Sequence, residues 1–248
     1  MSQAPVTPKL EFLDLSHWNV PVDWKELKKN KDLYAVGWKA TEGDYYVDNT
    51  YLDARHNAED NGYLWLAYHF ATNDRVEDQV YHFLEHADPD NHMRLCLDWE
   101  DYGSKQMTYD QAGEFLELCD KLSGRVITLY SGNTAKELMG DEPNPLFGKH
   151  PLWIPRYGGS INDQPEPQES WKQWDIWQYA ADGWGVEPNQ CPGVAGYPDC
   201  NVFSRSHDEV TRTWSGMSVI GQPVLPKRSV VTVTVEAPPG IRVVVKRG

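Results

Sequence analysis

Two acidic residues stand two positions apart at the end of an apolar run that spans residues 93–100. Side chains alternate between the two faces of a strand, so Asp98 and Glu100 are expected on the same side. Another apolar run, residues 10–15, carries a further acid, Asp14. Paired acids at the carboxyl end of a barrel strand suit cleavage of a glycosidic bond, in which one protonates the leaving oxygen and the other stabilises the cation-like sugar. Acids at strand ends can also be solvated loop entries, but a same-face pair together with Asp14 favours chemistry.

The composition narrows the classes of partner. The 248 residues suffice for one large barrel domain or two small ones. A net charge of −14 argues against nucleic acid, whose phosphates require a basic surface. The chain also has 11 Trp and 13 Tyr, and exposed aromatic rings can hold sugar rings, although most of these side chains are expected in the core.

Targeting segments and cysteines give weaker information. The first eight residues lack the basic and apolar stretches of a signal peptide. No apolar run reaches 18 residues, so no transmembrane helix is expected. Four cysteines are too few for a disulfide framework. Cys96 is expected inside the barrel and Cys119 in a helix, whereas Cys191 and Cys200 flank a Gly/Pro-rich loop and could either pair or stay reduced.

Strand-like and helix-like segments alternate along the first 157 residues. Strands are predicted at residues 10–15, 33–40, 63–70, 93–100, 125–131, 151–157 and 174–180, with a weaker one at 197–203. Helix starts are predicted at Asp23, Thr50, Asp74, Thr108 and Thr134, each with a capping oxygen before the first turn. The connections 158–173 and 181–196 are too rich in Gly and Pro for helices.

This order predicts an α/β fold, an irregular TIM-like (β/α)5(β)3 barrel that loses its outer helices in the last third. The connection 181–196 has no helix signal, so we expect the last strand to run antiparallel to its neighbours. Asp199, near the start of that strand, would then reach the same rim as Asp98. The barrel is expected to span residues 9–219.

Residues 222–248 differ from the rest of the chain. They alternate apolar and polar residues at 231–236 and again, in part, at 241–246, with a Pro-Pro-Gly turn between, which predicts a short C-terminal β-hairpin extension. The segment has five basic residues and one acid. It could therefore bind an anionic polymer, or it could cap the barrel and only stabilise the fold.

With the motifs placed, the chain resembles the family 25 glycoside hydrolases, the N-acetylmuramidases that cut bacterial peptidoglycan. Seven short motifs carry the resemblance, in the family's order and on the predicted strands: Asp14 to Trp18, Lys39 to Gly43, Tyr68 to Phe70, Leu97 to Glu100, Trp153 to Tyr157, Trp177 to Tyr179, and Asp199 to Asn201. The likeness covers roughly residues 10–205. The chain departs from the family at Asn19, at Pro155 and at the bulky Gly37-Trp38 pair, and none of these changes removes a carboxylate.

The resemblance implies hydrolysis, with retention, of the β-1,4 bond between N-acetylmuramic acid and N-acetylglucosamine. Glu100 is the expected general acid, because it lies nearer the rim and a neighbouring Asp98 anion would raise its pKa. Asp98 is then either the nucleophile or the group that stabilises the substrate's acetamido group. Asp14 and Asp199 would bind sugar and tune the pair, unless they only hold rim loops. Residues expected in the cleft wall are Tyr68, Tyr130, Trp153, Tyr157 and Gln178, each of which could instead belong to the core.

The expected partner is bacterial peptidoglycan, with no nucleic acid and no membrane insertion, and the protein is expected to be a monomer without metal or organic cofactor. The missing leader favours a phage-like endolysin over an exported effector.

His69 is expected to be a structural histidine facing away from the barrel interior. His82 and His86 have metal-ligand spacing but lack a third ligand nearby, so a solvated helix face is the better interpretation.

Two other classes of function stay open. A non-catalytic peptidoglycan-binding protein would keep the aromatic residues but tend to lose a carboxylate, and none is missing. A chitinase-like barrel glycosidase also ends a strand with Asp-x-Glu, but the longer acidic motif of that class is absent before Asp98.

Overall fold

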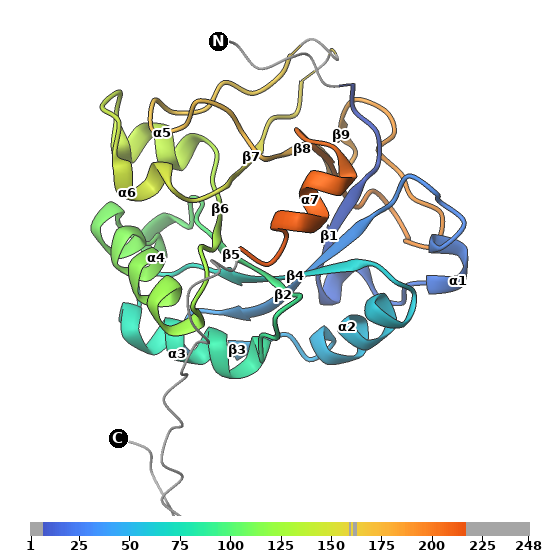
Figure 1. Cartoon of the computed structure of the whole chain (residues 1–248), viewed down its shortest axis with the longest axis horizontal. Coiled ribbons are helices and arrows are strands. Elements are labelled where there is room, and N and C mark those ends of the chain that lie inside the picture. Colours follow the sequence, from blue (N-terminus) through green and yellow to red (C-terminus); the bar gives the residue numbers. More distant parts are fainter. Residues whose placement is uncertain (1–6, 159, 161–162, 217–248) are drawn as a thin grey trace, which may run out of the picture.

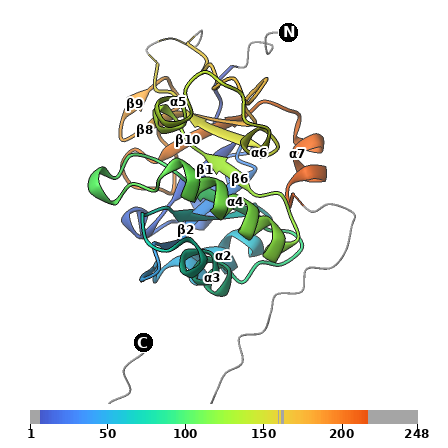
Figure 2. The same ribbon diagram turned by 90° about the vertical axis from the view of Figure 1, so that its left-hand side faces the viewer.

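The computed structural model describes residues 7–158, 160 and 163–216, which form a closed eight-stranded barrel with helices outside it (Figures 1 and 2). Neighbouring strands are parallel from the first to the seventh, and the eighth closes the ring by pairing antiparallel with both of its neighbours. In order the strands are β1 (Phe12–Leu15), β2 (Ala35–Glu42), β4 (Leu64–Phe70), β5 (Arg94–Asp98), β6 (Thr128–Tyr130), β7 (Leu152–Pro155), β8 (Ile176–Ala181) and β10 (Asp199–Phe203). The predicted α/β barrel is confirmed, as is the antiparallel direction of the last strand.

Two short strands, β3 (Tyr46–Val47) and β9 (Trp184–Gly185), form hairpin arms on β2 and β8. The β8–β9 hairpin turns at Asp182 and Gly183, both of which have positive φ angles. An Asp-Gly pair is favoured in a two-residue turn of this kind, because the turn requires left-handed backbone at both positions. The sequence interpretation overlooked this signal and treated the region as an irregular loop.

The helices that fill the connections are α1 (Trp24–Leu27), α2 (Tyr51–Asp60), α3 (Val76–Ala87), α4 (Tyr109–Ser123), α5 (Asn133–Met139), α6 (Pro145–Gly148) and α7 (His207–Thr213), with 3-10 turns at His17–Asn19 and Gly103–Lys105. The predicted capping box of Thr108 and Gln111 opens α4.

Two predicted helix starts were wrong. Helix α3 has Arg75 at its N-cap, because the Asp74 carboxylate instead accepts a hydrogen bond from the Thr72 hydroxyl. Helix α5 has Gly132 at its N-cap, so Thr134 lies inside it. Helices α6 and α7 were not expected, although Ser206 and Glu209 form a capping box at α7.

Helix α7 and the residue that follows it close the amino-terminal end of the barrel, and α7 lies across the ring of strands in Figure 1. Trp214 is 2% exposed and its indole N–H donates to the carbonyl of Trp65 at 2.9 Å. Its ring packs edge-on against Phe12 and Phe203, with centroid distances of 6.3 and 6.0 Å, and the guanidinium of Arg94 lies 5.1 Å from its centre. This end of the barrel interior is therefore filled with side chains.

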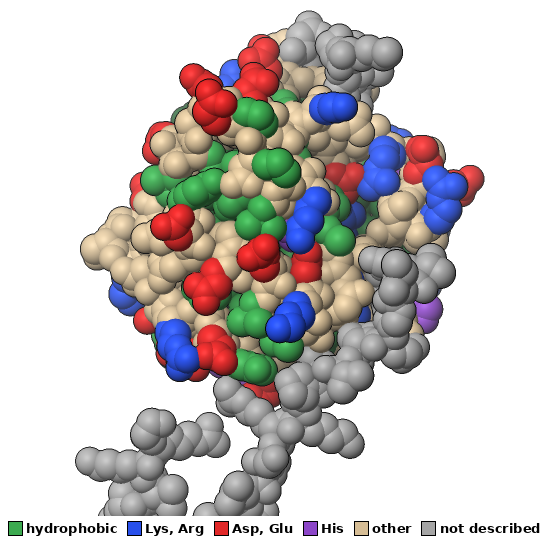
Figure 3. Space-filling view, turned by 60° about the vertical axis from the view of Figure 1, so that its left-hand side comes forward, with side chains coloured by type: hydrophobic (Ala, Val, Ile, Leu, Met, Phe, Trp, Pro, Cys, Tyr) green, Lys and Arg blue, Asp and Glu red, His purple; other side chains and the backbone are tan. Residues whose placement is uncertain are grey.

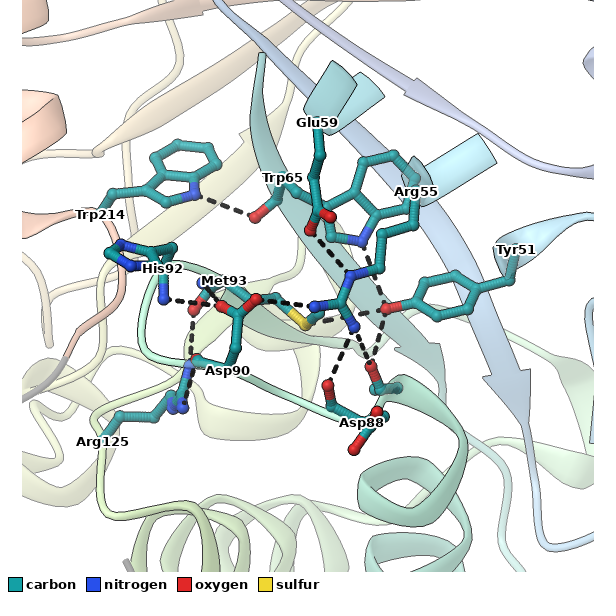
Figure 4. A network of polar contacts seen from close by, with 11 residues as sticks. Tyr51, Arg55, Glu59, Trp65, Asp88, Asp90, His92, Met93, Arg125 and Trp214 are labelled. Atoms are coloured by element: carbon teal, nitrogen blue, oxygen red, sulfur yellow. Dashed lines mark hydrogen bonds and ion pairs between the residues drawn. The ribbon is translucent and has the colours of Figure 1, made fainter. Parts of the chain in front are cut away.

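The turn that leads into β5 is held by two arginines (Figure 4). Arg125 donates to the carbonyls of Met93 and Asp90, and Arg55 donates to the carbonyl of Asp88 and to the Asp90 carboxylate at 2.7 Å. These bonds give arginine donors to the carbonyl groups of Asp88, Asp90 and Met93. They fix the start of the strand that ends at Asp98.

The remaining expectations on the whole chain have mixed outcomes. Cys191 and Cys200 do not pair, since all four cysteines are free and buried; Cys96 lies in the barrel interior and Cys119 in α4, as expected. No helix in the described part of the chain is long and apolar enough to cross a membrane.

On the face shown in Figure 3, acidic and basic side chains of the described residues are interspersed. The hairpin expected at residues 222–248 lies outside the described residues.

We expect Trp214→Ala to lower the free energy of unfolding by about 3–5 kcal/mol, because a large buried ring and its hydrogen bond are lost together. Trp18→Ala removes the same ring from a side chain that is 84% exposed and should change stability by less than about 0.5 kcal/mol. Denaturant unfolding of both variants measures the difference. Equal losses would show that Trp214 does not hold the barrel end closed.

Candidate active site

The carboxyl-terminal end of the barrel holds a cavity of about 350 Å³. All nine residues singled out from the sequence border it: Asp14, Asp98, Glu100, Asp199, Tyr68, Tyr130, Trp153, Tyr157 and Gln178. They come from β1, β4, β5, β6, β7, β8 and β10 and from the segments that follow β5 and β7, so the barrel gathers residues that are far apart in the sequence. Barrel enzymes keep their active sites at this end.

The orientation of Asp98 and Glu100 depends on the tryptophan between them. Trp99 is fully buried, packs on the ring of Phe147, and donates its indole N–H to the carbonyl of Met107 at 2.9 Å. Its backbone N–H donates to the carbonyl of Tyr130, which extends the pairing of β5 with β6 beyond Asp98. Because Trp99 points outward into the core, both of its neighbours face the cavity, as the alternation of a strand requires.

Asp98 and Glu100 lie where burial favours their neutral forms. Burial raises the pKa of Asp98 well above its usual range, and the charge of Glu100 raises it further. Burial also raises the pKa of Glu100, while the ammonium of Lys39 lowers it. We expected the Asp98 anion to raise the pKa of Glu100; instead, burial is the largest cause of that shift, and it is the charge of Glu100 that raises the pKa of Asp98. Such a pair titrates as a unit that retains one proton.

One oxygen of Asp98 has no partner. Its Oδ1 atom is buried and accepts no hydrogen bond from the described residues. An unpaired buried acceptor costs about 1–3 kcal/mol, so a site that keeps one is prepared for a donor from outside the protein.

Asp14, in contrast, is held by amide donors. Gln178 Nε2 lies 3.1 and 3.0 Å from its two oxygens, and Asn201 Nδ2 lies 2.6 Å from Oδ1. The orientation of the Gln178 amide is set because its oxygen accepts from the hydroxyls of Tyr130, at 2.8 Å, and Tyr157, at 2.5 Å. Gln178 is therefore a bridge between the tyrosines and Asp14, and only 2% of its surface is exposed.

Asp199 stands beside Asp14 because the two residues are register partners in the antiparallel pair of β1 and β10. Burial raises the pKa of Asp14 to about 7 and that of Asp199 to about 9, and Asp14 is the second cause of the Asp199 shift. Asp14 is the better anion of the two because it accepts the amide hydrogen bonds. Asp199 therefore holds the proton at neutral pH and donates it toward Asp14.

The comparisons with known proteins agree with this arrangement. The sequence model of Glycosyl hydrolases family 25 matches residues 13–186. The chain belongs to this family. It is a glycoside hydrolase of the lysozyme type, and it is 26% identical over 214 residues to Lysozyme M1 of Streptomyces globisporus, covering 81% of this chain and 69% of that one.

The chain is also similar to a solved lysozyme structure and to an uncharacterized bacterial protein. The bacterial lysozyme of Streptomyces coelicolor superposes with a TM-score of 0.72 at 25% identity, covering 83% of this chain and 97% of that chain. Protein YegX of Escherichia coli K12, which is uncharacterized, is 27% identical over 218 residues, covering 84% of this chain and 74% of that one.

The aromatic residues of the family 25 cleft divide into floor and mouth. Trp153 is 2% exposed, packs against Tyr130 and Phe12 in the barrel interior, and donates its indole N–H to Asn201 at 2.7 Å. It therefore borders the cavity from the floor, with most of its ring packed in the barrel interior, and its role in substrate binding stays a prediction. Tyr157 is 44% exposed and does lie at the mouth.

Two tryptophans at the mouth were missed as site residues. Trp18 is 84% exposed and Trp184 is 73% exposed, and both border the cavity. Trp18 rests on His17, with ring centroids 4.5 Å apart, and Trp184 is presented by the β8–β9 hairpin. Exposed rings at a pocket edge are suited to stacking on a sugar. The sequence carried signals for both: Trp18 ends the first motif, and Trp184 follows the Asp-Gly turn.

The histidines of the chain lie outside the cleft. His69 is fully buried on the outer side of the barrel, where it hydrogen-bonds to Thr41 and Gln79 and stacks on Phe115. Burial lowers its pKa to about 3, so it is the neutral structural residue that was expected. His82 and His86 are in ring contact, with centroids 4.7 Å apart, and the described residues hold no group of three ligands suited to a metal ion.

We expect Asp199→Asn to stabilise the fold increasingly as the pH rises from about 4 to 8. An Asp in an unfolded chain has a pKa of about 3.9, so the folded chain, with its raised pKa of about 9, is favoured most below pH 4 and loses that advantage as the pH rises. Asn cannot ionise and can still donate to Asp14, so the gain should reach roughly 1–3 kcal/mol at pH 8. Thermal unfolding across this range measures it.

The matched control is Asp44→Asn, which removes a carboxylate from an exposed position. It should give a small change that does not grow with pH. A gain for Asp199→Asn that is the same at pH 4 and pH 8 would contradict the protonated state of Asp199.

Proposed function

We propose that this lysozyme-type enzyme hydrolyses bacterial peptidoglycan at the β-1,4 bond between N-acetylmuramic acid and N-acetylglucosamine, with Glu100 as general acid and base. The observation that carries the proposal is the pair of buried Asp98 and half-buried Glu100 on one face of the cavity, with Asp98 Oδ1 lacking a partner among the described residues. Cleavage of a glycosidic bond needs one carboxyl that holds a proton at working pH and one that stabilises positive charge.

The free oxygen of Asp98 supports a role for the substrate's acetamido group. An N–H of that group, donated to Oδ1, would satisfy the buried acceptor and favour the Asp98 anion. The proton shared by the pair would then reside on Glu100. In this order of events, binding of the sugar itself moves the proton to the residue that must donate it.

The steps that follow use the same two residues. Glu100 donates its proton to the glycosidic oxygen as that bond breaks. The acetamido oxygen attacks C1 while Asp98 accepts the hydrogen bond from its N–H, or else Asp98 attacks C1 directly. Glu100, now ionised, takes a proton from the water that attacks C1 in the second step, and two displacements at C1 give retention. Asp14 and Asp199 would hold a sugar hydroxyl at the other side of the cavity.

The aromatic residues fit a polymer of sugars. A cavity of about 350 Å³ encloses the cleavage site, while Trp18 and Trp184 offer exposed rings at its mouth where the chain would continue. The substrate places the action of the enzyme at the bacterial cell wall. A non-catalytic binding role would not require this carboxyl pair, whose desolvation destabilises the fold at neutral pH.

We expect Glu100→Gln to lower kcat on purified peptidoglycan by at least ~10²-fold while the protein still folds, because general acid–base help is commonly worth ~10²–10⁴. The change keeps the size of the side chain. Glu114→Gln, on the exposed face of α4, is the matched control and should retain activity. Release of reducing ends is the measurement, run in parallel on chitin. Full activity of Glu100→Gln would refute the assignment, and cleavage of chitin alone would replace the substrate by that of the chitinase class.

We further propose that residues 222–248 attach the enzyme to anionic wall polymers, on the basis of their five basic residues and one acid. The carbonyl oxygen of Gly216, the last described residue, accepts a hydrogen bond from the N–H of Val126 at 2.9 Å.

Deleting residues 222–248 should leave activity on soluble fragments unchanged and weaken binding to intact walls. The binding that is lost should be the part that falls as salt is added, because salt screens charge attraction. Cosedimentation with walls at low and high salt measures this. Unchanged wall binding would rule out attachment, and loss of the thermal transition would favour a role in capping the barrel.

A further inference from the structure

Lys39 is the one cation among the described residues that border the cavity, against five carboxyl groups. It lies on β2, in register with Tyr68 of β4, and β4 in turn pairs with the strand that carries Asp98. A lysine in such a place would ordinarily be attributed to substrate binding. Its contacts indicate another role.

The Lys39 side chain is enclosed on three sides. Its ammonium lies 2.5 Å from Glu42 Oε2, 4.6 Å from the centre of the Phe70 ring and 5.5 Å from that of Tyr46. Only 13% of the Lys39 side chain and 16% of the Glu42 side chain are exposed. A flexible lysine is thus held in one place by an ion pair and two aromatic faces, where its charge is little screened by water.

Glu42 is fixed in turn by residues outside the cavity. Its Oε1 atom accepts hydrogen bonds from the hydroxyls of Tyr45, at 3.0 Å, and Tyr102, at 3.2 Å. Tyr102 reaches it from the segment just after Glu100, and its ring packs edge-on against Phe70. Each oxygen of Glu42 therefore has a partner, and the carboxylate opposes the charge of Lys39 from a set position.

We propose that Lys39 and Glu42 form a positioning pair that sets the pH range over which Asp98 and Glu100 hold one proton between them, with Lys39 moving that range down and Glu42 limiting the movement. The inference rests on the proposed function only in taking Asp98 and Glu100 as the reacting pair. Neither Lys39 nor Glu42 needs to touch the reacting atoms.

The charges around the pair support this division of roles. Lys39 is the largest opposing influence on both acids: its ammonium lowers the pKa of Asp98 and of Glu100 against the effect of burial. The other ionisable groups that face Asp98 and Glu100 are carboxyl groups that push the pKa values upward, and phenols and a thiol that stay neutral: Asp14, Asp199, Asp101, Tyr68, Tyr130, Tyr157 and Cys96. Without Lys39, no described residue at the cavity would lower the pKa of Asp98 or Glu100 by its positive charge.

The test is the pH dependence of kcat/KM, which reports the titration of the free enzyme. Lys39→Met should move both limbs of the profile to higher pH by about one unit, because the cation that favours the ionised acids is gone. Glu42→Gln should move both limbs to lower pH, by roughly half a unit, because Lys39 is no longer neutralised. Lys39→Arg keeps the charge and should restore the wild-type limbs.

A second measurement does not depend on activity. The ¹³C resonances of the Asp98 and Glu100 carboxyl groups, followed against pH without substrate, should move in the same two directions. Lys105→Met is the matched control, since Lys105 is exposed and lies over the rings of Tyr45 and Tyr102 rather than in the cavity. Its profile should coincide with that of the wild type.

Several outcomes would overturn the proposal. A rise in KM for Lys39→Met with both limbs in place would make Lys39 a substrate ligand. A fall in kcat without any shift of the limbs or of the carboxyl resonances, in a variant that keeps its thermal transition, would make the pair merely structural. If Lys39→Met does not fold, Glu42→Gln still tests the direction of the shift, and a profile of Glu42→Gln that does not move to lower pH overturns the proposal. A wild-type enzyme inactive on peptidoglycan would instead refute the proposed function. The ¹³C titration of the Asp98 and Glu100 carboxyl groups would then still test the role of Lys39 and Glu42.

Discussion

The antiparallel pairing of β10 with β1 is the constraint on which the site depends. Seven parallel strands alone would leave the barrel open between β8 and β1. The eighth strand closes the ring and, because it runs the other way, brings its first residue, Asp199, to the rim where the other strands end. A parallel strand in that place would have carried Asp199 to the closed end, beside Trp214. The same strand pairing therefore both closes the barrel and adds Asp199 to the acidic cluster.

The cluster imposes a cost that the rest of the structure offsets. Five carboxyl groups border one cavity, and burial raises the pKa of Asp14, Asp98, Glu100 and Asp199. Two kinds of interaction stabilise the ionised forms of these carboxyl groups. Amide donors from Gln178 and Asn201 hold Asp14 as the anion, whereas Lys39 opposes the rise at Asp98 and Glu100. The two halves of the cavity thus use different means to control charge, and only the Asp98 half keeps an unpaired acceptor. Sites that destabilise a fold in this manner are commonly functional.

The aromatic residues serve two separate purposes that their type does not reveal. Trp153, Trp99 and Trp214 are buried and anchor the floor, the β5 terminus and the closed end, each through an indole N–H bonded to the chain. Trp18 and Trp184 are exposed at the mouth. The buried set makes the cavity rigid, and the exposed set is available to a ligand, as a polymer substrate requires.

The sequence by itself determined the local features. Alternation along residues 93–100 put Asp98 and Glu100 on one face, the order of strands and helices indicated the barrel, and the lack of a helix signal in residues 181–196 indicated the direction of β10. These three predictions were correct because they depend on strand geometry and on the length and composition of short connections. Where a local competitor existed, the prediction failed: Asp74 bonds to Thr72 rather than capping α3.

Only the tertiary structure decided which polar groups meet and which rings are buried. Gln178 and Asp14 are 164 residues apart, and nothing near either one in the sequence indicates that an amide bridge joins them. The same holds for the tyrosines on Glu42, for the burial of Trp153 against the exposure of Trp184, and for the cause of the raised pKa of Glu100. Burial and hydrogen bonding are properties of all the segments that converge on a point. Residue type and spacing indicate which side chains reach the rim, and the packing of the closed barrel sets their charge.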